Sequence, residues 1–176
     1  RCSVSLPSHD PLGGGRVLDI FAPARKRRTP ERLDELTALE CEIPSERLKR
    51  LSEQSAWGLD LDRLQVAWNA PELAEQLPAD CRRIPIGSRT HAVAQSAWQA
   101  LAQRLVEGLA EYHARSPEEL GPDVGRARRL WMPRLPLPIF AALIARGALT
   151  RTGAWLHLPE HVLTLTPREQ ASAERI

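Results

Sequence analysis

The sequence predicts a mostly α-helical protein in which two groups of helices each end in a small β-hairpin. Apolar residues recur at three- and four-residue spacing over most of the 176 residues, which is typical of helices packed on one face. This spacing changes twice to short alternating runs around a glycine, near Gly87 and near Gly153. The same order of elements therefore occurs twice along the chain.

The first 28 residues are expected to precede the first group of helices. Three glycines at 13–15 lead into residues 16–21, a short strand candidate, and the run of Arg and Lys at 25–28 forms a basic connector. We interpret residues 1–28 as the last strand of an upstream domain followed by a linker. The sequence does not begin with Met, which agrees with a chain cut from a longer protein.

Four helices are predicted after this linker. Thr29 is a typical N-cap and Pro30 suits the first helical position. A second helix is expected to start at the cap residue Ser45, and a third lies before the turn at 69–71. A further helix carries the apolar pair Leu73 and Leu77.

A hairpin follows these helices. Residues 81–93 alternate between apolar and polar around Gly87-Ser88, and Pro85 places the first strand at the edge of a sheet because proline cannot donate to a neighbouring strand.

The second group begins with the clearest helix in the chain, whose apolar residues step by three or four positions: Trp98, Leu101, Leu105, Leu109 and Tyr112. A short helix starts near Asp123, another ends at Gly147, and a hairpin turns near Gly153. We expect Trp155 and the alternating leucines to form one buried face of this hairpin.

Helices followed by a hairpin, with two of the helices joined by a tight turn, form the winged-helix variant of the helix-turn-helix. The predicted architecture is therefore a tandem of winged-helix domains, at 29–93 and 94–161, with a third beginning at 162–176 and a helix there capped by Thr166. A single continuous helical domain is the alternative, but it has no use for the two hairpins.

The motifs of common enzymes and metal sites are absent from the sequence. It contains no GxxxxGK[ST] loop, no GxSxG motif and no CxxC pair, so neither catalysis nor a cofactor is expected in this chain. Its three cysteines are far apart, which is typical of free thiols in the reducing cytosol. His157 and His161 are four residues apart, but Pro159 between them excludes the helix that would align them on a metal. No apolar run approaches the roughly 18–20 residues that span a bilayer.

The charge is distributed unevenly along the chain. Residues 29–80 contain 12 acids and 5 bases, whereas residues 121–151 contain six arginines and one acid. Arginine grips phosphate with two parallel hydrogen bonds, so the second stretch is a candidate for nucleic-acid contact. Uneven charge on solvated faces is the other interpretation. The candidate binding residues are Arg126, Arg128, Arg129, Arg134 and Arg151.

The expected recognition helices are poorly suited to reading DNA bases. The helix at 137–146 carries apolar residues and a single charge at Arg146, and the corresponding segment of the first group carries Glu72, Glu75 and Gln76. Base edges are read by Arg, Lys, Asn or Gln, and glutamates repel phosphate. Trp131 among the arginines is expected in the core more readily than stacked on a base.

Two segments of the chain resemble the bacterial selenocysteine-specific elongation factor. The motif "EYHARSPEELGPDVGRARRLWMPRLP" followed by "GAWLHLPEH" is similar to the second winged helix of that family, and "LGGGRVLDIFAPARKRRTPERLDEL" is similar to the junction between its last β-barrel and its first winged helix. The resemblance implies a cytoplasmic GTPase, using GTP and magnesium in domains upstream of this chain, that delivers selenocysteinyl-tRNA to recoded UGA codons on the ribosome.

The resemblance further implies that this chain is a spacer and hinge between the tRNA-binding body and the tip that binds the selenocysteine-insertion mRNA hairpin, with auxiliary RNA contacts. We expect it to be monomeric, without a membrane partner. A winged-helix transcription regulator that binds DNA is the alternative function, and it requires an exposed basic recognition helix.

Overall fold

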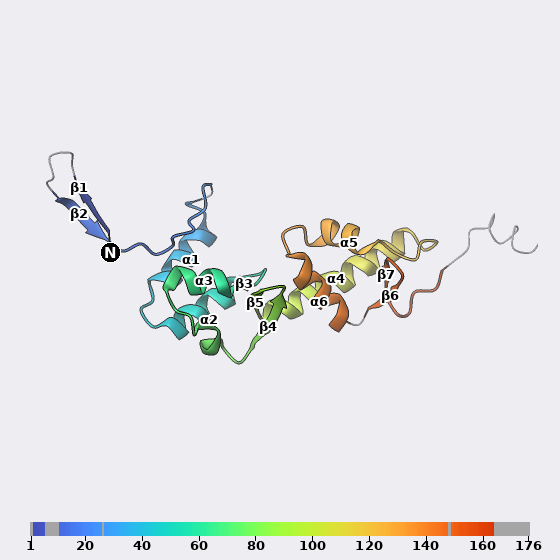
Figure 1. Cartoon of the computed structure of the whole chain (residues 1–176). Helices are drawn as coiled ribbons and strands as arrows, with labels where there is room; N and C mark the ends of the chain where they lie inside the picture. The colour runs from blue at the N-terminus through green and yellow to red at the C-terminus, as the bar shows by residue number, and fades with distance from the viewer. Residues whose placement is uncertain (1, 6–10, 26, 148, 164–176) are drawn as a thin grey trace, which may run out of the picture. The chain divides into compact units, whose positions relative to one another are not determined.

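The structure, a computed structural model, describes residues 2–5, 11–25, 27–147 and 149–163 (Figure 1). The chain divides into two compact units, Arg1–Ala94 and Gln95–Ile176. Within the described ranges, no helix combines the length and the apolar character needed to cross a membrane. The predicted C-terminal helix capped by Thr166 lies outside the described residues.

Unit 1 begins with an antiparallel hairpin of β1 (Cys2–Ser5) and β2 (Pro11–Gly15). The strand expected at residues 16–21 is wrong, because β2 ends at Gly15 and the chain then bends into a turn at Ile20 and Phe21. The Asp19 carboxylate accepts a hydrogen bond from the backbone N–H of Phe21 at 2.8 Å, and such a local bond bends the backbone away from extended geometry.

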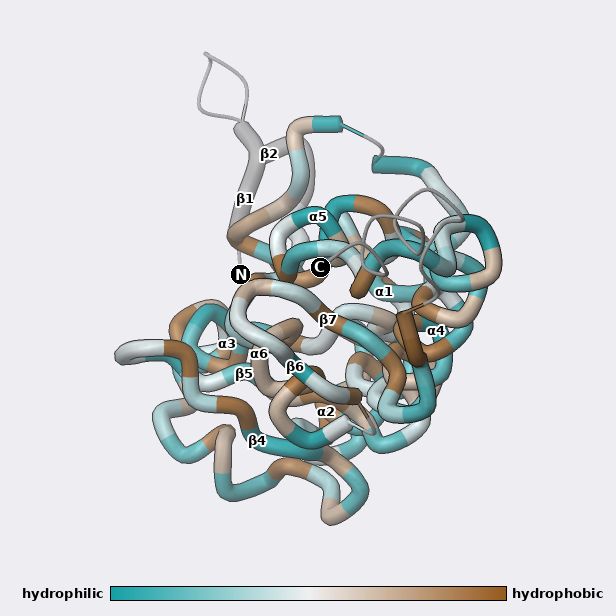
Figure 2. Tube along the Cα trace, turned by 90° about the vertical axis from the view of Figure 1, so that its right-hand side faces the viewer, coloured by the Kyte–Doolittle hydropathy of each residue, from teal (hydrophilic) through white to brown (hydrophobic). Residues whose placement is uncertain are grey.

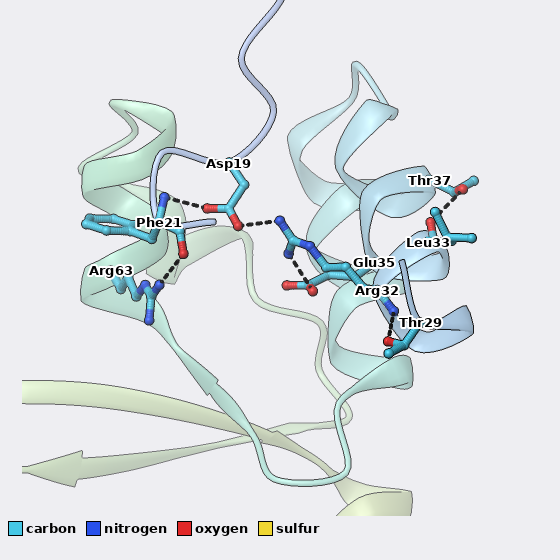
Figure 3. A network of polar contacts seen from close by, with 8 residues as sticks. All are labelled: Asp19, Phe21, Thr29, Arg32, Leu33, Glu35, Thr37 and Arg63. Atoms are coloured by element: carbon cyan, nitrogen blue, oxygen red, sulfur yellow. Dashed lines mark hydrogen bonds and ion pairs between the residues drawn. The ribbon is translucent and has the colours of Figure 1, made fainter. Parts of the chain in front are cut away.

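The first part of the linker, residues 16–21, is held against the helices of unit 1 by polar contacts (Figure 3). Arg32 of α1 (Pro30–Glu40) is 8% exposed and binds the carboxylates of Asp19 at 2.7 Å and Glu35 at 2.6 Å. Burial lowers the pKa of its guanidinium, but the hydrogen bonds to Glu35 and Asp19 outweigh burial and leave the pKa raised. The guanidinium of Arg63 lies 4.6 Å from the Phe21 ring centroid and donates to the Phe21 carbonyl at 2.9 Å.

The remaining elements of unit 1 form a winged helix preceded by α1. They are α2 (Pro44–Gln54), β3 (Leu59–Asp60), α3 (Leu61–Trp68), the 3₁₀ helix η1 (Leu73–Gln76), β4 (Cys81–Ile86) and β5 (Arg89–Ala94). The sheet has the order β3-β5-β4, so Pro85 lies on an edge strand as predicted. The core consists of Leu48, Leu61, Leu73 and Ala92.

Three local expectations in unit 1 have different outcomes. Thr29 is confirmed as an N-cap, because its hydroxyl accepts from the N–H of Arg32 at 3.3 Å. Ser45 is not a cap, because α2 begins one residue earlier at Pro44, whose fixed φ suits the first turn. The predicted helix of Leu73 and Leu77 is only the single 3₁₀ turn η1.

Unit 2 consists of a long helix, a helix-turn-helix and a hairpin. The elements are α4 (Gln95–Arg115), α5 (Val124–Trp131), α6 (Leu137–Arg146), β6 (Thr150–Thr152) and β7 (Trp155–His157). The predicted hairpin, called the wing below, is confirmed by the pairing of β6 with β7 (Figure 2). Its inward residue Leu156 is completely buried, as are Leu109 of α4 and Phe140 of α6.

Two close approaches of the backbone fix the wing and α5 in unit 2. A Cβ atom at Gly108 would lie 2.6 Å from the Trp131 ring, so α5 packs directly on the backbone of α4. Gly121 has φ +144°, and a Cβ there would lie 1.9 Å from the carbonyl oxygen of Leu156. The next residue, Pro122, accepts a hydrogen bond from the N–H of Leu156 at 3.0 Å.

The two units repeat the same local device at the start of the helix-turn-helix. Asp60 and Asp123 each pair through the backbone with the last strand of the hairpin and each cap the following helix. Their carboxylates accept from the N–H groups of Arg63 at 3.0 Å and Arg126 at 2.9 Å. The order of helix, bridge, capped helix, second helix and hairpin therefore recurs in both units, as expected for tandem winged helices.

Candidate nucleic-acid interface

The three arginines of α5 point in different directions. Arg126 is exposed, and its guanidinium lies 5.5 Å from the ring centroid of Tyr112 on α4. Arg129 is also exposed, and its Nη1 lies 3.4 Å from the place a Cβ of Gly125 would occupy. Arg128 is half-buried and turns toward the chain between α5 and α6.

Arg128 holds the turn of the helix-turn-helix together. Its Nη1 donates to the carbonyls of Pro133 at 3.2 Å and Leu135 at 3.1 Å. A guanidinium that satisfies two carbonyls beyond the end of a helix stabilises the chain there. Of the five arginines selected in the sequence, Arg128 therefore has a structural role that the others lack.

The other two selected arginines lie on the turn and the wing. Arg134 is exposed between α5 and α6, and Arg151 is exposed on β6. The Nε of Arg151 donates to the carbonyl of Gly153 at 2.8 Å, so its guanidinium lies near the hairpin turn. Among the ion pairs of the described residues, none involves Arg126, Arg129, Arg134 or Arg151. Four exposed cations thus remain available to an anionic partner.

The recognition helix α6 presents an almost neutral face to solvent. Its buried side is formed by Ile139, Phe140 and Leu143. The exposed residues of α6 are Leu137, Pro138, Ala141, Ala145 and Arg146. A helix needs several side-chain donors or acceptors to distinguish bases, and this face offers one. In unit 1 the corresponding element is a single 3₁₀ turn, which is too short to follow a groove.

The histidines of unit 2 hold the segment that follows the wing, residues 158–161. The rings of His113 and His161 stack with centroids 3.6 Å apart. Nε2 of His113 accepts a hydrogen bond from the N–H of Leu158 at 3.4 Å. In His157, Nε2 lies 3.0 Å from Thr152 Oγ1 and Nδ1 lies 3.0 Å from the Leu158 carbonyl oxygen. In the part of the chain that the structure covers, no cluster of three or more His, Cys, Asp or Glu residues can hold a metal ion.

His113 is a residue that the sequence pattern did not single out. Burial is the main cause that lowers the pKa of its imidazole, and the nearby His161 and His157 lower it further. Because Nε2 accepts a hydrogen bond, the neutral ring carries its proton on Nδ1, which is buried without a partner. The burial of His113 could have been inferred from its place in the last turn of the long helix, next to the apolar position Tyr112.

Two tryptophans near the arginines have opposite environments. Trp131 is half-buried against Gly108, in agreement with its expected place in the core. Trp155 was expected on the buried face of the wing, and this is wrong, because its side chain is 47% exposed. Leu156 takes the inward position instead, and neighbouring residues of a strand face opposite sides.

Comparisons with known proteins agree with the resemblance seen in the sequence. Residues 106–158 match the family model described as "Elongation factor SelB, winged helix". The selenocysteine-specific elongation factor of Escherichia coli (strain K12) is 27% identical over 94% of the chain. That of Haemophilus influenzae is 27% identical over 91% of the chain. The chain spans only 27% and 26% of the length of these two relatives.

Proposed function

Because the chain is similar to the winged-helix region of selenocysteine-specific elongation factors, we propose that it is a part of such a factor and contains its first two winged helices, at 29–93 and 94–161. In this proposal the chain is a spacer and hinge between the tRNA-binding body and the tip that binds the selenocysteine-insertion mRNA hairpin. GTP hydrolysis with magnesium and delivery of selenocysteinyl-tRNA on the ribosome, in the cytoplasm, are proposed for the whole protein.

The single observation that carries the spacer role is the scarcity of base-reading side chains on both recognition elements. The exposed face of α6 offers Arg146 alone, and η1 is one 3₁₀ turn that offers Gln76 beside the exposed acids Glu72 and Glu75. A winged helix with so few base-reading side chains is suited to positioning its neighbours. The linker supports this role, because the buried Asp19–Arg32 pair ties residues on the N-terminal side to α1.

Auxiliary contacts to RNA are proposed for the exposed arginines of unit 2, namely Arg126, Arg129, Arg134 and Arg151. They lie in a segment, residues 124–159, that contains six arginines and no acid. Contacts of this kind bind the phosphate backbone of any RNA and carry no sequence information.

A salt titration of RNA binding tests these proposals. The 176-residue chain is titrated with the insertion hairpin and with an unrelated hairpin of equal length, and fluorescence anisotropy is followed from about 50 to 200 mM salt. We expect weak binding with similar affinity for both RNAs. Each of the single changes Arg129→Ala, Arg134→Ala and Arg151→Ala should make the negative slope of log K against log salt shallower by about one.

Arg115→Ala is the matched control, because Arg115 is an exposed arginine of α4 that pairs with Glu111 at 3.7 Å. It should leave the slope unchanged. Nanomolar binding specific to the insertion hairpin would contradict the spacer role. An unchanged slope in all three arginine variants would remove Arg129, Arg134 and Arg151 from the proposed RNA contacts.

A winged-helix regulator of transcription is the second candidate function. It would require specific binding of duplex DNA at physiological salt. The exposed face of α6 disfavours this function, because Arg146 is its only charged residue. The same anisotropy titration with duplex DNA libraries separates the two candidates.

A further inference from the structure

We propose that Trp155, at the start of β7, is a platform on which a base of single-stranded RNA stacks. The inference rests on the auxiliary RNA contacts proposed above and adds to them a side chain and a form of RNA. The arginines explain attraction to any phosphate, whereas an exposed indole distinguishes an unpaired base from a paired one.

The first step of the argument is the exposure of Trp155. Among the tryptophans of the described ranges it is the most accessible, at 47%, while Trp98 is buried and Trp131 is packed on Gly108. It lies on a hairpin of only two strands, whose inward residue is Leu156. Tryptophan is enriched at interaction surfaces because its ring is apolar and its N–H is polar.

The second step is the rigid placement of this ring beside the arginines. The backbone of Trp155 pairs with Asp123, and the next residue, Leu156, donates to the Pro122 carbonyl at 3.0 Å. Asp123 is the N-cap of α5, so β7 is fixed alongside the first turn of the helix that carries Arg126 and Arg129. An aromatic platform held by backbone hydrogen bonds loses little conformational entropy when a base stacks on it.

The wing turn keeps this surface open. Thr152 pairs with Trp155, so the turn consists only of Gly153 and Ala154. Nothing lies within 4 Å of the place a Cβ of Gly153 would occupy. Arg151 stands on the adjacent strand and binds the Gly153 carbonyl through its Nε at 2.8 Å. The turn therefore leaves the ring uncovered, and the Arg151 guanidinium lies at the turn itself.

Charge identifies the occupant as RNA rather than as a protein segment. The segment from Val124 to Pro159, which contains both the arginines and Trp155, has no acidic residue. The carboxylate of Asp123, whose backbone pairs with Trp155, is engaged by the N–H of Arg126 at 2.9 Å. Proteins bind single-stranded nucleic acid with arginines that follow the phosphates and aromatic rings that stack on the bases. Bases in a duplex are already stacked on each other and cannot use the ring.

The test compares three variants for binding to a fluorescein-labelled 12-nucleotide single-stranded RNA and to a duplex of the same sequence. Trp155→Ala should weaken binding to the single strand at least about fivefold, the lower end of base–aromatic stacking, and leave duplex binding unchanged. Trp155→Phe should retain most of the affinity. Leu137→Ala, which removes a side chain that is 54% exposed on α6, is the control and should have no effect.

The salt slope separates this inference from the proposed function. Trp155→Ala removes no phosphate contact, so the slope should equal that of the unchanged chain while the affinity falls at every salt concentration. If Trp155→Ala binds the single strand within twofold of the unchanged chain, the platform is refuted and the surface fits a protein partner instead. If the unchanged chain binds neither RNA, the proposed RNA contacts fail as well, and the inference fails with them.

Discussion

Two arginines that are adjacent in the sequence have different structural roles in the folded chain. Arg128 and Arg129 are neighbours in α5, yet Arg128 binds two carbonyls of the turn and Arg129 extends into solvent. The helical period places consecutive residues about 100° apart around the axis, so a cluster in the sequence is not a cluster on the surface.

This difference predicts opposite effects of two neighbouring substitutions. Arg128→Ala should lower the free energy of unfolding of unit 2 by about 1–2 kcal/mol, because it leaves the carbonyls of Pro133 and Leu135 without their donor. Arg129→Ala should change stability by less than about 0.5 kcal/mol. Urea denaturation of both variants measures the difference. Equal stability of the two would show that the Arg128 bonds contribute nothing to the fold.

The stacked histidines make the stability of unit 2 depend on pH. The pKa of His113 lies below its ordinary value of 6.5 in the folded chain, so unfolded chains take up the proton first as the pH falls. The stability contributed by the neutral ring is fully present above pH 6.5 and is lost as the pH falls below that value. Protonation would also remove the acceptor for the Leu158 N–H and place a charge against His161.

We therefore expect the midpoint of thermal unfolding of unit 2 to decrease between pH 7.5 and 5.5, and His113→Gln to reduce this decrease. Differential scanning calorimetry of both chains across this range provides the measurement, and His91 of unit 1 is common to both and cancels in the difference. An identical pH profile for the variant would assign the effect to another group.

Sequence reasoning succeeded at the residue scale where the cause was local. The cap at Thr29 depends on a hydroxyl and the N–H three residues later, both of which are visible in the sequence. The exposure of Trp155 was not visible, because alternation shows which residues of a strand share a face and does not show which face meets the core. In the structure Leu156 faces the core, and its backbone N–H binds the Pro122 carbonyl, a contact between segments far apart in the sequence.

At the scale of elements, the contact between α4 and α5 depends on the missing side chain of Gly108. A Cβ there would lie 2.6–2.7 Å from three atoms of the Trp131 indole. Gly108→Ala should therefore lower the free energy of unfolding by about 1–3 kcal/mol through overpacking, despite the better helix propensity of alanine.

The sign of this effect should reverse when the indole is absent. In a chain that already carries Trp131→Ala, adding Gly108→Ala should stabilise α4 by up to about 1 kcal/mol, because only the helix propensity remains. Chemical denaturation of the unchanged chain, the two single variants and the double variant gives the coupling free energy between residues 108 and 131. Additive effects would show that the two residues do not contact each other.

The elements that the sequence predicted wrongly are those shaped by neighbours along the chain. The segment of Leu73 and Leu77 has helical spacing, but Pro71 and Pro78 bracket it and Leu77 before Pro78 is extended, so only the turn η1 forms. Residues 16–21 have the composition of a strand, and their Asp19 carboxylate is engaged by Phe21 and Arg32 instead. The two prolines are visible in the sequence, whereas the Asp19–Arg32 pair is a tertiary contact that no local pattern shows.

At the scale of the whole molecule, the repeated order of elements predicted tandem winged helices, and the structure confirms this fold class. The two hairpins led to this prediction, because glycine at the first of two turn residues indicates a hairpin turn. Both Gly87 and Gly153 have φ +60°. The candidate interface was predicted only as a set of arginines. Which of them are exposed depended on long-range packing.

The close approach of Gly121 to the Leu156 carbonyl restricts which residues can replace Gly121 during evolution. A side chain at that position would occupy the space of the Leu156 carbonyl, so mutation there is tolerated only if the hairpin itself is rebuilt. Relatives that keep the hairpin should therefore keep glycine at this position even where the surrounding loop has diverged or changed in length. In families as divergent as 27% identity, this position offers a fixed point from which distant members can be aligned.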